Sequence, residues 1–247
     1  MERSRPSRPG SHQLDAAGRG RHRTRTRRSR HGRLVGAVED EELSMTAAHP
    51  DEAQRITPEQ FLEAEPDSLS TTFGDFEIID GLVIRAMAQS EAHSRVVRRL
   101  AAAIENARDP AGPCLRVGSD VAVRFADTDD APADQRLNVR YPDIFVRDCE
   151  PYDVNTVREH ISLVAEIASR ATVDADTGVK RQLYARAGIP VYLIVHFDKS
   201  WNRIDRIEEY RLDWSGMRYM PHRVHRTALV LDTPVTLAIT LDALDSP

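Results

Sequence analysis

The chain contains few cysteines and no long apolar run. Cys114 and Cys149 are its only cysteines, which is too few for a disulfide framework, and nothing in the sequence indicates export. We therefore expect a reducing compartment and a cytoplasmic location. No stretch approaches the roughly 20 apolar residues that a membrane-spanning helix needs. We accordingly expect no membrane partner.

Several motifs that identify common enzyme classes are also absent. The sequence has no Walker loop, no Rossmann glycine pattern, no cysteine pair at zinc-binding spacing and no Gly-x-Ser-x-Gly turn. Asp174 and Asp176 lack the alternating acidic ligands and the terminal glutamate of an EF-hand. Asp176 is instead expected near a helix N-terminus, where the helix dipole favours a negative charge.

The N-terminal segment lacks the apolar residues that folding requires. Residues 1–33 hold eleven arginines against Glu2 and Asp15, and the rest of the chain carries a formal charge of −14. We predict a disordered arm over residues 1–50 and a folded domain over residues 56–247. The arm has two explanations: a nucleic-acid-binding tail that acts through counterion release, or a translated upstream region with Met45 as the natural start. No apolar segment follows the basic residues, so a signal peptide is not expected.

Capping residues and periodicity predict the elements of the first half. A capping box predicts a short helix over residues 57–65. Asp80 and Gly81 predict a hairpin turn between strands at 76–79 and 82–87. Ser90 is the expected N-cap of a longer helix. The apolar residues of that helix recur at helical spacing: Val96, Val97, Leu100, Ala101 and Ile104.

The second half predicts a mixed α/β sheet. A helix over residues 177–187 should end at Gly188, because Pro190 blocks its continuation. The connection from residue 167 through this helix to residue 191 suits a right-handed parallel crossover. Residues 127–138 predict an exposed loop. Strands are expected at 115–125, 142–146, 161–167 and 191–195, with an antiparallel pair at 207–212 and 217–220.

Lysine is scarce, and this makes Lys180 informative. The chain has only two lysines, Lys180 and Lys199, and uses arginine wherever else it needs positive charge. A lysine kept in this background indicates a need for a compact ammonium that a planar guanidinium does not meet. The alternative is an ordinary solvated helix residue.

Two carboxylates precede Lys180 on predicted strands. Glu166 interrupts the apolar run at 161–167, where a buried charge costs several kcal/mol unless it is paired or bound to a metal. Asp143 follows Pro142 at a strand end, where a turn role is the alternative. Carboxylate oxygens suit a hard divalent cation, and a lysine can orient water and offset charge on a phosphate. These are the parts that a magnesium-dependent nuclease needs.

In these residues the chain resembles the Uma-like family of restriction endonucleases, and the core of that family is similar to the PD-(D/E)XK nuclease superfamily. The resemblance covers about three quarters of the chain. It implies a restriction-endonuclease-like mixed sheet flanked by helices. The runs that carry it are ITPEQFLE, FEIIDGLVIRAMAQSEAHSRVVRRLAAAI, YPDIFV and LVAEIASRATVDADTGVKRQLYARAGIPVYLIV.

The resemblance also implies residue roles. The superfamily lysine is missing from the strand, where Ala168 stands, and the family pattern moves it to Lys180. Glu77 stands where the family supplies a further acidic residue, with a strand-edge glutamate as the alternative. His93 stands where the family often has histidine, with a capping contact to Ser90 as the alternative. Val179 and the run SRAT depart from the usual pattern without touching the three core positions.

We therefore predict a Mg²⁺-dependent DNA endonuclease, a hydrolase in which Mn²⁺ can substitute for Mg²⁺. Asp143, Glu166 and Glu77 are its predicted metal ligands, and Lys180 joins them as a catalytic residue. Its predicted partner is DNA, and a homodimer is left open beside a monomer. The competing hypothesis is a nuclease-fold module that binds nucleic acid or protein with little catalysis. That module would use a basic patch formed by Arg95, Arg98 and Arg99.

Overall fold

The computed structural model describes residues 55–64, 69, 76–86, 88–125 and 137–246. The predicted arm over residues 1–50 lies outside this part of the chain. So does the predicted loop at 127–138, apart from its last two residues, of which Asn138 is a buried strand residue. Among the described helices, none is long and apolar enough to cross a membrane.

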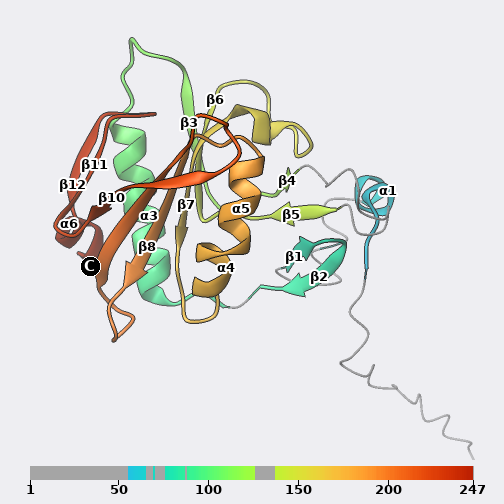
Figure 1. Ribbon diagram of the computed structural model, residues 1–247, viewed down its shortest axis with the longest axis horizontal. Helices are drawn as coiled ribbons and strands as arrows, with labels where there is room; N and C mark the ends of the chain where they lie inside the picture. The colour runs from blue at the N-terminus through green and yellow to red at the C-terminus, as the bar shows by residue number, and fades with distance from the viewer. Residues whose placement is uncertain (1–54, 65–68, 70–75, 87, 126–136, 247) are drawn as a thin grey trace, which may run out of the picture. The chain divides into compact units, whose positions relative to one another are not determined.

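A six-stranded mixed sheet forms the centre of the domain, as the sequence predicted (Figure 1). Strands β7 and β8 are parallel and every other neighbouring pair is antiparallel. The parallel pair is joined through two short helices, α4 (Val173–Thr177) and α5 (Val179–Arg186), which form the predicted crossover. In spatial order the strands are β10 (Tyr219–His225), β9 (Ile204–Leu212), β8 (Val191–Phe197), β7 (Ile161–Ile167), β6 (Ile144–Asp148) and β3 (Leu115–Gly118).

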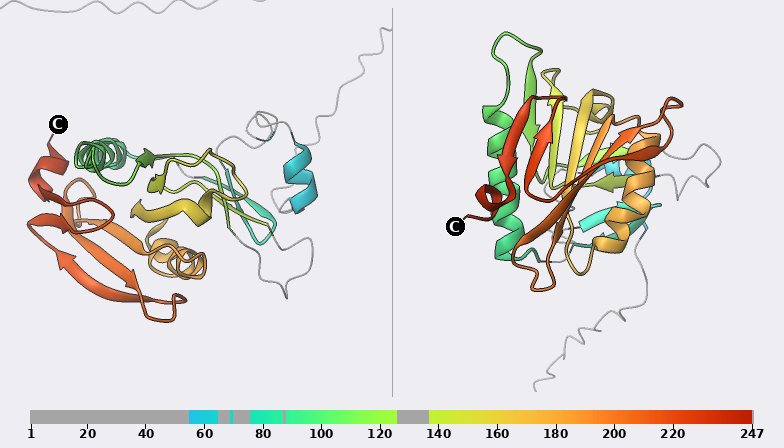
Figure 2. Two further views of the ribbon diagram at one scale, coloured as in Figure 1. Left: turned by 90° about the horizontal axis from the view of Figure 1, so that it is seen from above. Right: turned by 60° about the vertical axis from the view of Figure 1, so that its left-hand side comes forward.

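Helices cover both faces of this sheet. The right-hand view of Figure 2 shows the strands between α3 (Glu91–Asn106) on one side and α5 on the other. Residues of α3 such as Leu100 pack with Leu163 and Leu193, while Tyr184 of α5 packs with Val164 and Tyr192. Successive residues of a strand point to opposite faces. Residues 164, 166 and 168 of β7 and its continuation therefore face α5.

A second sheet lies beside the first and has its own apolar cluster. Asp80 (φ 49°) and Gly81 (φ 80°) form the predicted hairpin turn, since both have the positive φ of the twisted two-residue turn. Helix α1 (Pro58–Glu63) begins with the predicted capping box between Thr57 and Gln60. The strands of this sheet are β2 (Leu82–Arg85), β1 (Phe76–Ile79), β5 (Asn138–Arg140) and β4 (Val123–Phe125).

The predicted strand at 115–125 is wrong, because the chain changes sheets within it. Its first part is β3 of the large sheet, its last part is β4 of the small sheet, and Asp120 turns between them with φ 52°. The predicted helix at 177–187 is confirmed as α5, and a separate short helix, α4, precedes it across Gly178. A Cβ atom at that residue would lie 2.8 Å from the Asp174 carbonyl oxygen, so the tight join between α4 and α5 requires glycine.

The C-terminal part contains elements that the sequence analysis missed. The 3₁₀ helix η2 (Val157–His160) precedes β7, and the hairpin β11 (Ala228–Leu231) and β12 (Leu237–Thr240) is followed by α6 (Leu241–Asp245). Leu229, Leu237 and Leu244 from this region join the core on the α3 face. Short elements of this kind give too little periodicity to be read from sequence.

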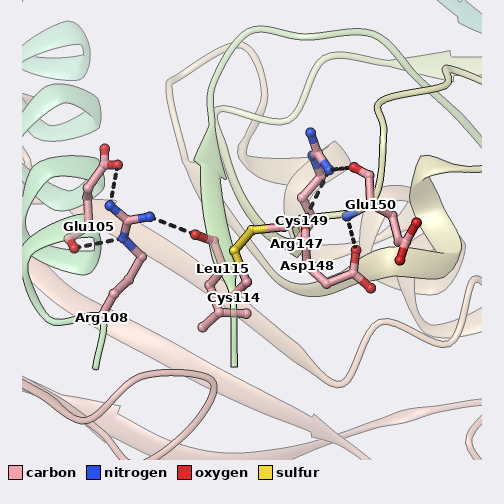
Figure 3. The surroundings of a disulfide bond; sticks show 8 residues. All are labelled: Glu105, Arg108, Cys114, Leu115, Arg147, Asp148, Cys149 and Glu150. Atoms are coloured by element: carbon pink, nitrogen blue, oxygen red, sulfur yellow. Dashed lines mark hydrogen bonds and ion pairs between the residues drawn. A yellow bond between two sulfur atoms is a disulfide. The ribbon is translucent and has the colours of Figure 1, made fainter. Parts of the chain in front are cut away.

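The two cysteines form a disulfide, which the sequence analysis did not expect (Figure 3). Cys114 precedes β3 and Cys149 follows β6, next to the Leu115–Asp148 pair of these antiparallel strands. The bond closes a loop over a sequence separation of 35, which restricts the unfolded chain. Loop closure of that length contributes about 3 to 4 kcal/mol in the chain-entropy account. Both thiols are oxidised, in contrast to the reducing compartment that we expected.

Candidate active site

Asp143 lies where β6 begins, opposite Glu166 of β7. The register pairs Ile144 with Ala165, so one further step places Asp143 across from Glu166 on the face that α5 covers. The Oδ2 atom of Asp143 accepts a hydrogen bond from the main-chain N–H of Ile167 at 2.7 Å. The structure thus supplies the register that brings these two carboxylates together.

His93 also contacts Asp143, from the first turn of α3. Its Nε2 lies 3.1 Å from Asp143 Oδ2, and its main-chain N–H donates to Ser90 Oγ at 3.1 Å. The capping contact and the contact in the site, which were alternatives in the sequence, therefore both occur. The first comes from the main chain of His93 and the second from its side chain.

Glu166 is buried, with 2% of its surface exposed, and both of its oxygens are held. Its Oε1 accepts from the Tyr184 hydroxyl at 2.5 Å, and its Oε2 accepts from Lys180 Nζ at 3.1 Å. Burial raises the pKa of Glu166 well above its ordinary value; Lys180 opposes this rise, while the neighbouring charges of Asp143 and Asp176 add to it.

Lys180 points from α5 into a group of carboxylates. Its Nζ lies 3.1 Å from Glu166 Oε2, 3.2 Å from Asp176 Oδ1 and 3.7 Å from Glu77 Oε1. Burial alone would lower the pKa of Lys180, but the carboxylates, Glu166 first, raise it above its ordinary value. The ammonium is therefore charged throughout the ordinary pH range. Ala168 follows β7, is itself buried, and leaves this position for the lysine to approach from the helix.

Glu77 on β1 connects the small sheet to this group. Its Oε2 pairs with Arg140 Nη1 of β5 at 3.0 Å, and its Oε1 faces Lys180. The sequence analysis did not single out Arg140, which is buried and 63 residues away from Glu77 along the chain. Its sequence signal is weak, because the three-residue strand Asn138–Arg140 has a single aliphatic residue and no apolar pattern.

Asp176 is the second residue whose place the sequence analysis missed. It lies near the end of α4, two residues before the Gly178 join, and its side chain faces Lys180. Burial raises its pKa, and the charge of Lys180 opposes this rise. The spacing of four residues between Asp176 and Lys180 is the signal that indicates the contact.

Lys180 and the carboxylates of Glu77, Asp143 and Glu166 line a pocket of about 900 Å³. Apolar and polar residues of both sheets line it, together with the loop after β7 and helices α3, α4 and α5. The charged and titratable side chains in its wall include Glu77, His93, Arg140, Asp143, Glu166 and Lys180.

The donor chemistry of this group fits a hard divalent cation. Four carboxylates, of Glu77, Asp143, Glu166 and Asp176, face two fixed cations, Lys180 and Arg140. The carboxylates of this group outnumber its two cations, and carboxylate oxygens are the preferred ligands of Mg²⁺. As arranged, no three His, Cys, Asp or Glu side chains within the described ranges form a group that could hold a metal ion. Lys180 contacts the Glu166 and Glu77 oxygens instead.

A mixed sheet between helices, with facing strand carboxylates and a lysine beside a pocket, defines a restriction-endonuclease-like α/β protein. The chain belongs to the Uma2 family, described as putative restriction endonuclease, whose model matches residues 58–243. No curated protein matches the chain.

The fold is similar to that in a crystal structure of a putative nuclease belonging to DUF820 from Anabaena variabilis. The two share 16% sequence identity with a TM-score of 0.53, over 77% of this chain and 97% of that chain. At this identity the likeness concerns the fold. The family membership supports a nuclease function.

Proposed function

We propose that the protein is a metal-dependent endonuclease that hydrolyses phosphodiester bonds in DNA. One observation carries the proposal: Lys180 of α5 lies 3.1 Å from Glu166 of β7, in the wall of the pocket that Asp143 also lines. A lysine that only stabilised the fold, through a buried ion pair with a strand carboxylate, would not need to lie beside a pocket. Beside a pocket, it is placed to act on a bound phosphate.

Asp143, Glu166 and Glu77 would hold Mg²⁺, and Mn²⁺ would substitute for it. When bound, the cation would lower the pKa of a bound water and neutralise charge on the phosphate. The protein prepares these ligands through their partners. The N–H of Ile167 and the imidazole of His93 orient Asp143, and Arg140 fixes one oxygen of Glu77.

Lys180 would orient the attacking water and offset the negative charge that develops on the phosphate. Its ammonium donates in any direction, whereas a guanidinium donates only in its plane. Several carboxylates around Lys180 raise its pKa, which supports a role in electrostatic stabilisation and in hydrogen bonding.

A binding module with little catalysis is the competing function, and the structure gives it less support. Of the three arginines on α3 that would form its basic patch, two are engaged within the protein. Arg95 donates to the carbonyl of Asn202 at 3.0 Å, and Arg99 donates to the carbonyl of Ala243 at 3.5 Å. We propose DNA as the substrate. The predicted place of action, the cytoplasm, is a reducing compartment in which the Cys114–Cys149 disulfide is not expected to persist, so the redox state of these two cysteines in cells tests that prediction. Light scattering distinguishes a monomer from a homodimer.

Cleavage of supercoiled plasmid tests the proposal directly. The purified full chain is titrated with Mg²⁺ or Mn²⁺, and nicked and linear products are measured over time. We expect metal-dependent nicking that Asp143→Asn abolishes. The matched control is Asp213→Asn, at a half-buried aspartate of the β9–β10 turn that lies outside the pocket wall. It should cut like wild type.

Two results would reject the proposal. One is an absence of cleavage by wild type with either metal on plasmid and on short duplexes. The other is equal cleavage by wild type and Asp143→Asn, which would identify a contaminating nuclease. A parallel assay on single-stranded DNA and on RNA of the same sequence shows whether duplex DNA is the preferred substrate.

A further inference from the structure

Asp176 is a buried carboxylate with unusually few partners. Only 1% of its surface is exposed, and the polar side chains that lower its pKa in the described part of the chain are those of Lys180 and Thr172. Its ion pair there is with Lys180, at 3.2 Å. A buried charge of this kind is costly unless an opposite charge compensates it. The place of Asp176 is therefore tied to that of Lys180.

Asp176 contacts Lys180 but does not belong to the described pocket wall. Lys180, Glu166 and Glu77 all line the pocket wall, whereas Asp176 is not among the described residues that do so. A cation in the pocket would be in direct reach of the carboxylates in its wall, Glu166 and Glu77. This separates Asp176 from the three carboxylates that we propose as metal ligands.

Lys180 itself contacts the oxygens that a cation would use. Its Nζ faces Glu166 Oε2 and Glu77 Oε1, while Tyr184 and Arg140 hold the other oxygen of each carboxylate. The ammonium and a metal ion would thus compete for the same two oxygens. When a cation takes them, Lys180 keeps one carboxylate partner, which is Asp176.

We propose that Asp176 is a positioning residue that holds the Lys180 ammonium in the site while a divalent cation occupies Glu166 and Glu77. The inference rests on the proposed function, because it assumes that these two carboxylates bind the cation. Asp176 touches neither substrate nor metal in this account. It acts through Lys180 alone.

The local structure is built to keep the pair together. Asp176 and Lys180 are four residues apart but lie on two separate helices, joined at Gly178 where a side chain would meet the Asp174 carbonyl. The hydroxyl of Tyr192, on the central strand β8, donates to the carbonyl oxygen of Asp176 at 2.9 Å. The main chain at Asp176 is therefore anchored to the sheet, and the carboxylate is aimed at the lysine.

Metal affinity tests the inference without using catalysis. MnCl₂ is titrated calorimetrically into the full chain and into the variants Asp176→Asn, Lys180→Ala and the double variant. In Asp176→Asn the ammonium has only the metal-binding carboxylates left as partners. We expect its Mn²⁺ affinity to fall about 10- to 100-fold, the effect of one buried charge-assisted contact. Removing the competing lysine should restore the affinity, so the double variant should bind Mn²⁺ like Lys180→Ala.

The matched control is Asp174→Asn, which removes an exposed aspartate of the same helix and should bind Mn²⁺ like wild type. If Asp176→Asn does not fold, Asp176→Glu takes its place. Its longer side chain misplaces the ammonium, and the resulting loss of affinity should also vanish with Lys180→Ala.

The results separate the inference from the function on which it rests. Unchanged Mn²⁺ affinity in Asp176→Asn would overturn the inference, and so would weak binding that persists in the double variant, since Asp176 would then act independently of Lys180. In both cases wild type still binds Mn²⁺ and the proposed function stands. A wild type that binds no Mn²⁺ would overturn the metal-dependent function and the inference together.

Discussion

Two groups of buried charges lie on opposite faces of the large sheet, and they differ in charge balance. On the α5 face, four carboxylates meet Lys180 and Arg140 beside a pocket. On the other face, the carboxylate of Glu209 on β9 accepts from Arg211 Nε at 2.6 Å and lies 2.9 Å from His225 Nε2. Glu209 pairs with Leu193, whose side chain belongs to the core on the α3 face.

In the group around Glu209, the side chains of Glu209, Arg211 and His225 supply one another's hydrogen-bond partners. The Nδ1 atom of His225 accepts from the N–H of Val230 at 3.4 Å, which leaves a proton on Nε2 for Glu209. The carboxylate of Glu209 has an arginine, Arg211, as its partner of opposite charge within the group. Such a group needs no ligand, and we assign it a structural role. The pocket group has negative charge left over, and in a buried setting this marks a place for a cation.

The largest expected effect is a loss of cleavage rate when Lys180 is replaced, whereas replacement of the other lysine, Lys199, should cause none. Lys180→Ala and Lys180→Arg should each lower the cleavage rate about 100- to 1,000-fold, the size of effect of one lost electrostatic contact to the transition state. Arginine should fail because its planar fork does not fit among the three carboxylates. Single-turnover plasmid cleavage at saturating Mg²⁺ measures the rate. Lys199→Ala, at an exposed site, should cut like wild type.

This prediction has a definite opposite. Lys180→Arg would contradict it by keeping more than about a third of the rate, a change in activation free energy of under 1 kcal/mol. Positive charge alone would then be enough for cleavage, and the scarcity of lysine in the chain would not bear on the site. Circular dichroism on each variant excludes unfolding as the cause of a loss.

The Glu209 group should affect stability and leave cleavage intact. Glu209→Ala removes the buried partner of Arg211 and His225, leaving Arg211 only the exposed Asp232, and should lower the free energy of unfolding by about 3 kcal/mol. Chemical denaturation measures the change. Asp232→Ala removes the exposed partner of the same arginine and should cost under about 1 kcal/mol. A folded Glu209→Ala protein without cleavage activity would contradict the distinction between the two groups.

A divalent cation should stabilise the protein through the pocket group alone. At 100 times its dissociation constant, Mg²⁺ should raise the free energy of unfolding by about 2.7 kcal/mol. Glu166→Gln should abolish this gain, and Glu209→Gln should keep it. Denaturation with and without Mg²⁺ gives both numbers. An equal gain in Glu166→Gln would place the cation elsewhere.

The features that the sequence predicted correctly depend on local chemistry. The Asp80–Gly81 turn, the Ser90 cap and the helix stop at Gly188 each depend on residues adjacent in the chain. The parallel crossover followed from element order, since a helix between two buried strands has few other arrangements. Glu166 stood out because a charge in an apolar strand needs a partner.

The features that the sequence could not predict depend on contacts between distant segments. The register that sets Asp143 opposite Glu166 depends on how β6 and β7 pair. Arg140 reaches Glu77 across 63 residues, and the change of sheet after β3 depends on which sheet edge is free. The burial of Asp176 depends on the separate helix α4, which the sequence did not predict before the helix that begins near residue 177.

The smallest expected effect is a pH dependence of stability in metal-free protein. Folding raises the pKa of Glu166 above its ordinary value of 4.5, so between 4.5 and the folded pKa the folded state holds a proton that the unfolded state has lost. Stability from this group is complete below about pH 4.5 and falls as pH rises, by up to about 1.4 kcal/mol per pH unit. Glu166→Gln removes the titrating group and should flatten the curve. Saturating Mg²⁺ should also flatten it, because a bound cation keeps the carboxylate ionised in the folded state. Denaturant titrations between pH 4.5 and 8 give the slopes. A metal-free protein that becomes more stable over this range, with a slope that Glu166→Gln leaves unchanged, would show that the pocket group is already balanced, like the group around Glu209.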